Sequence, residues 1–123
     1  MFRKKILVVD DEPDILKTTR YILEGAGYQV YTAGSGEEGL ELLEKNELDL
    51  VLLDLMLPGQ SGFEIARKIK SIDSYKNIPI IVLSCKTEDT DKYIAVKSGV
   101  VEYIEKPINS DKLLFHVQDV LKP

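Results

Sequence analysis

The stretch VLLDLMLPGQSG, residues 51–62, decides the fold because a short, continuous apolar run ends there in one acid and a turn. Runs of this length are typical of strands that are covered on both faces, as in parallel sheets. A charged Asp54 beside buried apolar residues costs folding free energy, so such an acid is expected to be paired, bound to a metal or functional. No residue nearby in sequence neutralises it. We therefore expect the rest of the chain to supply its partner.

Strand-like segments alternate with helical patterns along the whole chain. The expected strands are ILVVD (6–10), YQVYTA (28–33, alternating as in an edge or half-covered strand), LDLVLLD (48–54), IPIIVLS (78–84) and VVEYIEK (100–106). The expected helices are residues 13–26, a helix after the Ser35–Glu38 capping box, residues 62–70, residues 89–98 and a last helix capped by Ser110 or Asp111. This order predicts an α/β fold: a five-stranded parallel sheet, (βα)5 and doubly wound.

Composition places the chain among globular proteins and excludes several functions. It has 123 residues, 44% of them hydrophobic and 30% charged, so we expect one domain over residues 1–123. The net charge of −5 argues against direct binding of nucleic acid, which needs a basic face. The single cysteine rules out an internal disulfide, and no apolar run is long enough to cross a membrane. We therefore expect a cytoplasmic protein without membrane insertion.

Polar residues stand at the carboxyl ends of the expected strands, which is where ligands bind in open parallel sheets. They are Asp10, Asp11, Asp54, Ser84 and Lys106, the last followed by Pro107. Three carboxylates brought together repel one another unless a cation joins them, and an oxygen-only ligand set suits Mg²⁺. A lysine and a hydroxyl opposite the metal complete the groups that phosphoryl transfer to a carboxylate needs. The set therefore indicates a Mg²⁺-dependent phosphoryl-transfer site.

Each of these residues also has a structural explanation when it is taken alone. Asp10 or Asp11 can cap the first helix, and for Asp11 alone capping is the favoured explanation. Asp54 can start the turn that follows it, Ser84 can cap a helix, and Lys106 can be a solvated loop lysine. Because all five converge on one edge of one expected sheet, a functional site explains the set better than five separate structural roles do.

Two other classes of protein fit the sequence poorly. Phosphatases of the haloacid dehalogenase type need a second aspartate two residues after the nucleophile, where this chain has Met56. A dinucleotide-binding fold opens its first helix with a glycine-rich loop, where this chain has DDEPD (10–14). The acids of that segment would repel a pyrophosphate.

The segments KILVVDDEPDI (5–15), DLVLLDLMLPGQSGFE (49–64), IPIIVLS and YIEKPI (103–108) resemble the receiver domain of two-component response regulators over nearly the whole chain. The resemblance implies a flavodoxin-like fold and a phosphorylation-activated switch that modifies itself and is not an enzyme acting on a separate substrate. It implies that Asp54 accepts a phosphoryl group from the phosphohistidine of a sensor histidine kinase. It also implies that Asp11 and Asp54 ligate Mg²⁺ directly, Asp10 through water and Met56 through its main-chain carbonyl.

The same resemblance assigns roles to the residues around the acceptor. Lys106 would stabilise the added negative charge, and its peptide bond to Pro107 would be cis. The Ser84 hydroxyl would swing to the bound phosphoryl group, and Tyr103 would be the switch aromatic that turns inward when Ser84 moves. Pro58 and Gly62 match the turn that follows the acceptor in the family.

The resemblance also implies partners. Phosphorylation would change the surface formed by the helix 89–98, the strand 100–106 and the last helix, and this surface would control an output domain or a partner protein. Thr18, Arg20 and Tyr21 are candidates for contacting the kinase. The chain can be a stand-alone receiver or the first part of a longer regulator. It can also form a phosphorylation-dependent homodimer. The alternative function is that of a receiver-like protein-binding scaffold that is not phosphorylated.

A few positions depart from the family's pattern. Cys85 replaces the usual alanine after Ser84, where a thiol either narrows access to the phosphoryl group or simply fills space. Val100 and Val101 replace small and acidic residues, which weakens any transfer of charged dimer contacts from other receivers. The lone His116 falls on the last helix, where we expect a surface or interface residue outside the site.

Overall fold

Strands and helices alternate along the chain, as predicted. The computed structural model describes residues 3–85, 97 and 99–123. Its elements are β1 (Lys5–Val9), α1 (Pro13–Gly25), β2 (Gln29–Ala33), α2 (Gly36–Lys45), β3 (Leu50–Asp54), β4 (Met56–Leu57), β5 (Gln60–Ser61), α3 (Gly62–Ser71), β6 (Ile80–Ser84), β7 (Glu102–Glu105) and α5 (Ser110–Val120). The helix expected over residues 89–98 lies outside the described residues, except for Lys97.

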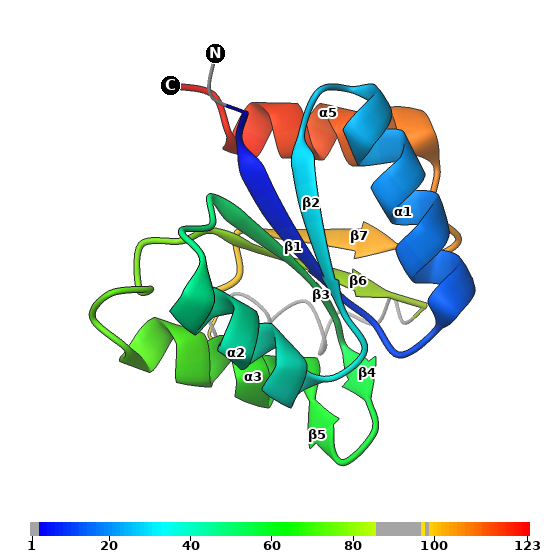
Figure 1. The fold of residues 1–123 in the computed structure, drawn as a ribbon. Helices are drawn as coiled ribbons and strands as arrows, with labels where there is room; N and C mark the ends of the chain where they lie inside the picture. The colour runs from blue at the N-terminus through cyan, green and yellow to red at the C-terminus, as the bar shows by residue number, and fades with distance from the viewer. Residues whose placement is uncertain (1–2, 86–96, 98) are drawn as a thin grey trace.

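Five of the strands form one parallel sheet in the order β2-β1-β3-β6-β7. α1 and α5 lie against one face of this sheet, and α2 and α3 lie against the other (Figure 1). β1 pairs with both β2 and β3, so that Val9 lies opposite Ala33 on one side and Leu53 on the other. The predicted doubly wound, five-stranded parallel sheet is confirmed, and β2 lies at its edge as its alternating pattern indicated.

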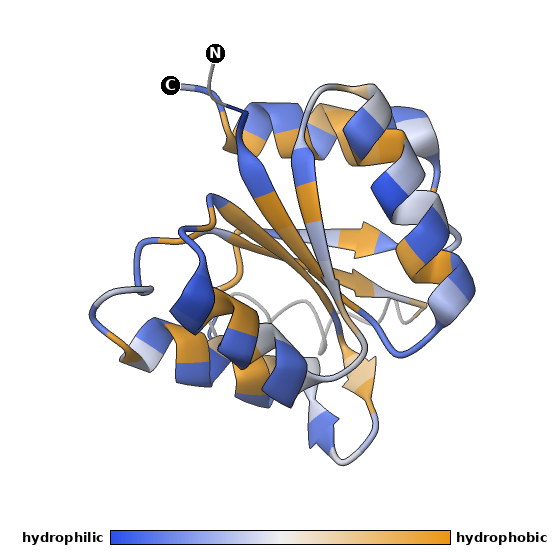
Figure 2. Cartoon of the chain, in the orientation of Figure 1, coloured by the Kyte–Doolittle hydropathy of each residue, from blue (hydrophilic) through white to orange (hydrophobic). Residues whose placement is uncertain are grey.

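The sheet is apolar on both faces because successive residues of a strand point to opposite sides. In β1, Leu7 and Val9 belong to the core cluster beneath α2 and α3. Ile6 and Val8 belong to the second cluster, together with Leu23 of α1 and apolar residues of α5. Figure 2 shows the hydrophobic strands enclosed by helices that carry hydrophilic residues on their outer faces. Within the described part of the chain, no helix is long and apolar enough to cross a membrane.

The start of α2 follows the predicted capping box, with one difference. Ser35 is the N-cap, and its Oγ accepts a hydrogen bond from the Glu38 N–H at 3.2 Å. The Glu38 carboxylate turns back, as such a box requires, but it accepts from the N–H of Gly34 and not from that of Ser35. Two N–H groups at the helix start are satisfied in this way.

The predicted cap of the last helix is wrong. We expected Ser110 or Asp111, but Asn109 is the N-cap of α5, and its Oδ1 accepts from the Lys112 N–H at 3.0 Å. Asn109 still has an extended backbone, with φ −102° and ψ 124°, so the first helical residue is Ser110. Three consecutive residues are good capping types, and the path of the chain selects the first of them.

A short hairpin follows β3 where only a turn was predicted. β4 and β5 pair antiparallel, with Met56 opposite Ser61 and Leu57 opposite Gln60. The turn between them contains Gly59, whose φ of 78° favours glycine. This hairpin projects from the carboxyl edge of the main sheet, next to the end of β3 (Figure 1).

Candidate functional site

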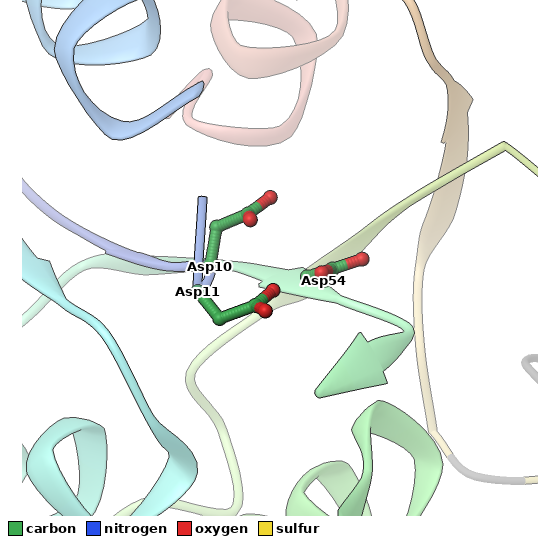
Figure 3. A group of neighbouring side chains, drawn as sticks. All are labelled: Asp10, Asp11 and Asp54. Atoms are coloured by element: carbon green, nitrogen blue, oxygen red, sulfur yellow. The ribbon is translucent and has the colours of Figure 1, made fainter. Parts of the chain in front are cut away.

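Three carboxylates meet at the carboxyl edge of the sheet. Asp10 directly follows β1, Asp11 is the next residue, and Asp54 is the last residue of β3. One carboxylate oxygen from each lies within 4.8 Å of the others, and Figure 3 shows the side chains reaching the same space from the two strand ends. Asp10 and Asp54 are buried, whereas Asp11 is exposed to solvent. The structure therefore brings together the three acids that the sequence placed at strand ends.

Lys106, which follows β7, supplies positive charge beside these acids. Its Nζ donates to Oδ2 of Asp10 at 2.8 Å and lies 3.4 Å from Oδ1 of Asp54, and only 7% of its side chain is exposed. The Lys106–Pro107 peptide is cis, as the resemblance implied. The Lys106 N–H donates to the carbonyl of Ser84 at 2.8 Å, which holds this loop against the end of β6. Lys106 is therefore the partner of Asp54 that the neighbouring sequence lacks.

Glu12 is a fourth acid near Lys106, and the sequence did not single it out. It is the N-cap of α1 and makes no side-chain capping hydrogen bond, so the alternative explanation that Asp10 or Asp11 simply caps this helix does not hold. Oδ1 of Asp10 instead accepts from the Glu12 N–H at 2.9 Å. Oε1 of Glu12 lies 3.9 Å from Nζ of Lys106. The available signal was a glutamate at a helix start, where Ser, Thr, Asp or Asn is preferred.

Burial and charge act together on the central pair of the site. Burial raises the pKa of Asp54 and the charge of Asp10 raises it further, against the lowering effects of the Met56 N–H and Lys106. Burial alone would lower the pKa of Lys106, but its hydrogen bonds to Asp10 and Asp54 and their attraction outweigh burial. The pKa of Lys106 is therefore raised, and the lysine stays charged. It lies beside Asp54, whose ionised form is disfavoured by burial.

The donor set fits a small divalent cation. Three carboxylates share this space with one buried lysine, so negative charge exceeds positive charge within the cluster. Carboxylate oxygens are the ligands that Mg²⁺ prefers, and Mg²⁺ is usually held by one or two carboxylates together with waters. Because Asp11 is exposed, the cluster is open to solvent on one side. The acids can therefore bind a metal that keeps part of its water.

The other predicted site residues lie around the cluster. Ser84 ends β6 and is buried, and it lies next to the end of β3 because Leu83 pairs with Asp54. Met56 is 60% exposed, and its N–H donates to Oδ1 of Asp54 at 3.2 Å. Tyr103 is half-buried in β7 and packs against the cluster beneath α2 and α3. Their positions suit the expected roles, which stay predictions.

A glycine fixes the backbone on the other side of Asp54. The Gly62 N–H donates to the Leu55 carbonyl at 2.7 Å. A Cβ at Gly62 would overlap the carbonyl oxygen of Asp54 and come within 2.8 Å of the Leu55 Cα. Beside this close approach, a cleft of about 480 Å³ runs from Asp11 along the β4–β5 hairpin. Gly62, at the start of α3, therefore has no room for a side chain, and the cleft beside it is lined by Asp11 of the acid cluster.

Two further residues from the sequence analysis lie elsewhere. Cys85 is exposed and directly follows β6. His116 is half-buried on α5, where its Nδ1 lies 3.4 Å from Oε2 of Glu102, so it belongs to the β7–α5 surface and not to the acid cluster.

Comparisons with known proteins identify the family. The family model for the response regulator receiver domain matches residues 6–118. The chain is 37% identical over 117 residues to the transcriptional regulatory protein AfsQ1 of Streptomyces coelicolor, which covers 95% of this chain and 51% of that relative. It is 32% identical to the chemotaxis protein CheY4 of Vibrio cholerae, with a TM-score of 0.94, covering 98% of this chain and 100% of that structure. A BeF3-activated DrrB receiver domain is 33% identical, with a TM-score of 0.88, covering 99% and 100%.

The fold and the site define a doubly wound α/β protein with an acidic, lysine-containing site at the carboxyl edge of its sheet. The chain belongs to the response regulator receiver domain family of two-component systems, a family of phosphoacceptor switches. The receiver fold that the sequence motifs implied is confirmed. The chain spans about half the length of the curated relative that it matches.

Proposed function

We propose that this domain is a phosphorylation-activated signalling switch in which Asp54 accepts a phosphoryl group from the phosphohistidine of a sensor histidine kinase. The observation that carries the proposal is the buried Asp54 carboxylate, which lies beside two further acids and 3.4 Å from Lys106. Membership of the receiver family supports it. The domain acts on itself, catalysing only its own phosphorylation and dephosphorylation.

The proposed chemistry is a direct transfer. An oxygen of the Asp54 carboxylate attacks phosphorus while the P–N bond of the donor breaks, and the bonding electrons stay on the imidazole nitrogen. The product is an acyl phosphate on Asp54. A phosphoryl group carries about 1.5 to 2 negative charges at neutral pH, and the ammonium of Lys106, 3.4 Å from the Asp54 carboxylate, lies close enough to stabilise them. We assign the Ser84 hydroxyl as a donor to a phosphoryl oxygen.

We propose Mg²⁺ as the cofactor. Asp11 and Asp54 would ligate it directly, Asp10 through water, and the main-chain carbonyl of Met56 would complete the protein ligands. When bound, Mg²⁺ offsets the charge of the acids and polarises the phosphoryl oxygens. The support for this assignment is electrostatic, because one lysine does not neutralise three carboxylates.

The proposed output is a change at the surface that includes β7 and α5. Tyr103 is half-buried, so its packing can change when Ser84 moves toward the phosphoryl group. The surface would control an output domain of a longer regulator or a separate partner, or drive a phosphorylation-dependent homodimer. We further propose that residues 1–123 act as one cytoplasmic domain, and that Thr18, Arg20 and Tyr21, all exposed on α1, contact the kinase.

Phosphorylation is tested by incubating the protein with acetyl phosphate and Mg²⁺ and measuring its intact mass. We expect a gain of one phosphoryl group that is absent in Asp54→Asn and in EDTA. Asp14→Asn is the matched control, because Asp14 is an exposed acid of α1 outside the cluster. A full gain in Asp54→Asn would place the acceptor elsewhere. No gain in the unsubstituted protein, with Mg²⁺ binding shown separately, would favour an unphosphorylated scaffold.

The switch is tested with beryllium fluoride, which mimics a phosphoryl group and activates the related DrrB receiver domain. We expect the amide resonances of β7 and α5 to shift when beryllium fluoride and Mg²⁺ are added together. Resonances near Asp54 that shift while those of β7 and α5 do not would contradict the proposed output surface.

A further inference from the structure

We infer that Glu12 is a positioning residue: it holds the ammonium of Lys106 toward Asp10 in the unphosphorylated domain and thereby slows phosphorylation of Asp54. The inference rests on the proposed function of Asp54 and concerns the regulation of that site.

The first observation is a closed ring of three residues. Oδ1 of Asp10 accepts from the Glu12 N–H at 2.9 Å, and Oδ2 of Asp10 accepts from Nζ of Lys106 at 2.8 Å. Oε1 of Glu12, at 3.9 Å from the same Nζ, completes the ring. Asp10 therefore fixes the backbone of Glu12 at the point from which its side chain reaches Lys106.

The second observation is that the Glu12 side chain makes no capping hydrogen bond and no other ion pair within the described residues. It stands at the N-cap of α1, the position at which a side chain usually accepts from the first turn, and it makes no such bond. Its only ion pair within the described part of the chain is the one with Lys106. Glutamate is one methylene longer than aspartate, the usual capping acid, and this length suits a reach across the site.

The consequence follows from competition for one ammonium. Nζ of Lys106 lies closer to Asp10, at 2.8 Å, than to Asp54, at 3.4 Å. A phosphoryl group on Asp54 needs this ammonium, so every carboxylate that draws it elsewhere opposes the transfer. The Glu12 side chain is 62% exposed, so its pull is screened by solvent and salt and amounts to a small bias.

The first test follows Lys106 directly, without phosphodonor or metal. We expect the NMR resonances of the Lys106 Cε methylene to shift in Glu12→Gln and in Glu12→Asp. Aspartate keeps the charge, but its shorter side chain caps the helix and does not reach the lysine. Asp14→Asn removes one charge from the same helix and should leave these resonances in place. Resonances unchanged in both Glu12 variants would overturn the inference.

The second test compares initial rates of mass gain in acetyl phosphate and Mg²⁺. We expect both Glu12 variants to be phosphorylated about two- to fivefold faster than the unsubstituted protein, the range that one exposed ion pair can supply. The difference should shrink at high salt, and Asp14→Asn should not show it. An equal gain in Asp14→Asn, or a Glu12→Asp rate equal to that of the unsubstituted protein, would show an effect of net charge and overturn positioning. If the unsubstituted protein gains no phosphoryl group, the proposed function fails, while the resonance test still decides whether Glu12 holds Lys106.

Discussion

Nζ of Lys106 donates a 2.8 Å hydrogen bond to Oδ2 of Asp10, although the two residues are 96 positions apart in the chain. The Asp10 side chain is fully buried and that of Lys106 is 7% exposed. Moving two charges out of water is expensive, and their attraction repays the cost only when the geometry is good. Removing one member of such a pair leaves the other charge buried without compensation. The contact therefore couples the stability of the fold to the electrostatics of the site.

Lys106→Met tests this coupling. It leaves Asp10 and Asp54 buried without a cation, and we expect the free energy of unfolding to fall by about 3 kcal/mol at neutral pH. The pKa of Lys106 is raised above 10.5 in the fold, so its stabilisation is complete below that value and is lost as the pH rises through the folded pKa. The loss should therefore be fully expressed at neutral pH. Urea denaturation in EDTA measures it.

Two controls accompany the Lys106→Met experiment. Excess Mg²⁺ should recover part of the lost stability, because a divalent cation can replace the missing charge among the acids. Lys112→Met, which removes an exposed lysine from α5, should change stability little. Equal losses in the two variants would mean that the buried pair does not contribute to stability.

Asp54→Asn should stabilise the metal-free protein. Burial raises the pKa of Asp54 above its ordinary value of 3.8, so the ionised carboxylate destabilises the fold at neutral pH. As the pH falls through the folded pKa, the native state takes up a proton before the unfolded state does, and the penalty disappears below 3.8. Asn carries no charge, so we expect a gain of about 1 kcal/mol at neutral pH.

The gain in the free energy of unfolding that Asp54→Asn brings should therefore shrink as the pH is lowered toward 3.8. Thermal unfolding in EDTA, measured across this pH range, checks both the sign and the trend. Asp14→Asn, which removes an exposed charge, serves as the control. An Asp54→Asn protein that is less stable at neutral pH would show that attraction to Lys106 outweighs the cost of burial.

The fold could be predicted from the sequence because its central strands are buried on both faces. ILVVD, LVLLD and IIVLS are continuous apolar runs, a pattern that suits few structures other than a covered parallel strand. The predicted ends of the second, third and fourth strands of the main sheet along the chain, at Ala33, Asp54 and Ser84, are confirmed. The other ends differ by one or two residues, since an apolar run does not record where pairing with a neighbour stops. The choice of Asn109 over Ser110 as a cap likewise depends on where the backbone turns.

The site was predictable as a meeting of strand ends, but its contacts were not. The rule that parallel strands share a carboxyl edge brings Asp10 and Lys106 to one side of the sheet. It does not predict that they touch, because β3 and β6 lie between β1 and β7 in the strand order. Glu12 was missed for a similar reason: its ion pair depends on the path of the loop after β7, which no local pattern records.

Gly62→Ala should disturb both the fold and the acceptor. Its Cβ would overlap backbone atoms of Asp54 and Leu55, which cannot move as the end of a flexible side chain can. We expect a loss of about 2 kcal/mol in the free energy of unfolding and slower phosphorylation of the displaced Asp54. Gly25→Ala is the control, since nothing lies within 4 Å of a Cβ there and Ala favours the helix. A Gly62→Ala protein as stable as Gly25→Ala would contradict the close approach.

Thr19→Val should stabilise the domain. Thr19 is fully buried on α1, and its Oγ1 has no hydrogen-bond partner within the described part of the chain. A hydroxyl that loses water without gaining a partner costs free energy, and valine has nearly the same shape and helix propensity without the polar atom. We expect the free energy of unfolding to rise by about 1 kcal/mol in urea denaturation. Thr18→Val, at the exposed neighbouring position, should have little effect, because its hydroxyl stays in water. A loss of stability in Thr19→Val that is absent in Thr18→Val would mean that the hydroxyl has a partner, such as a buried water, which the substitution removes.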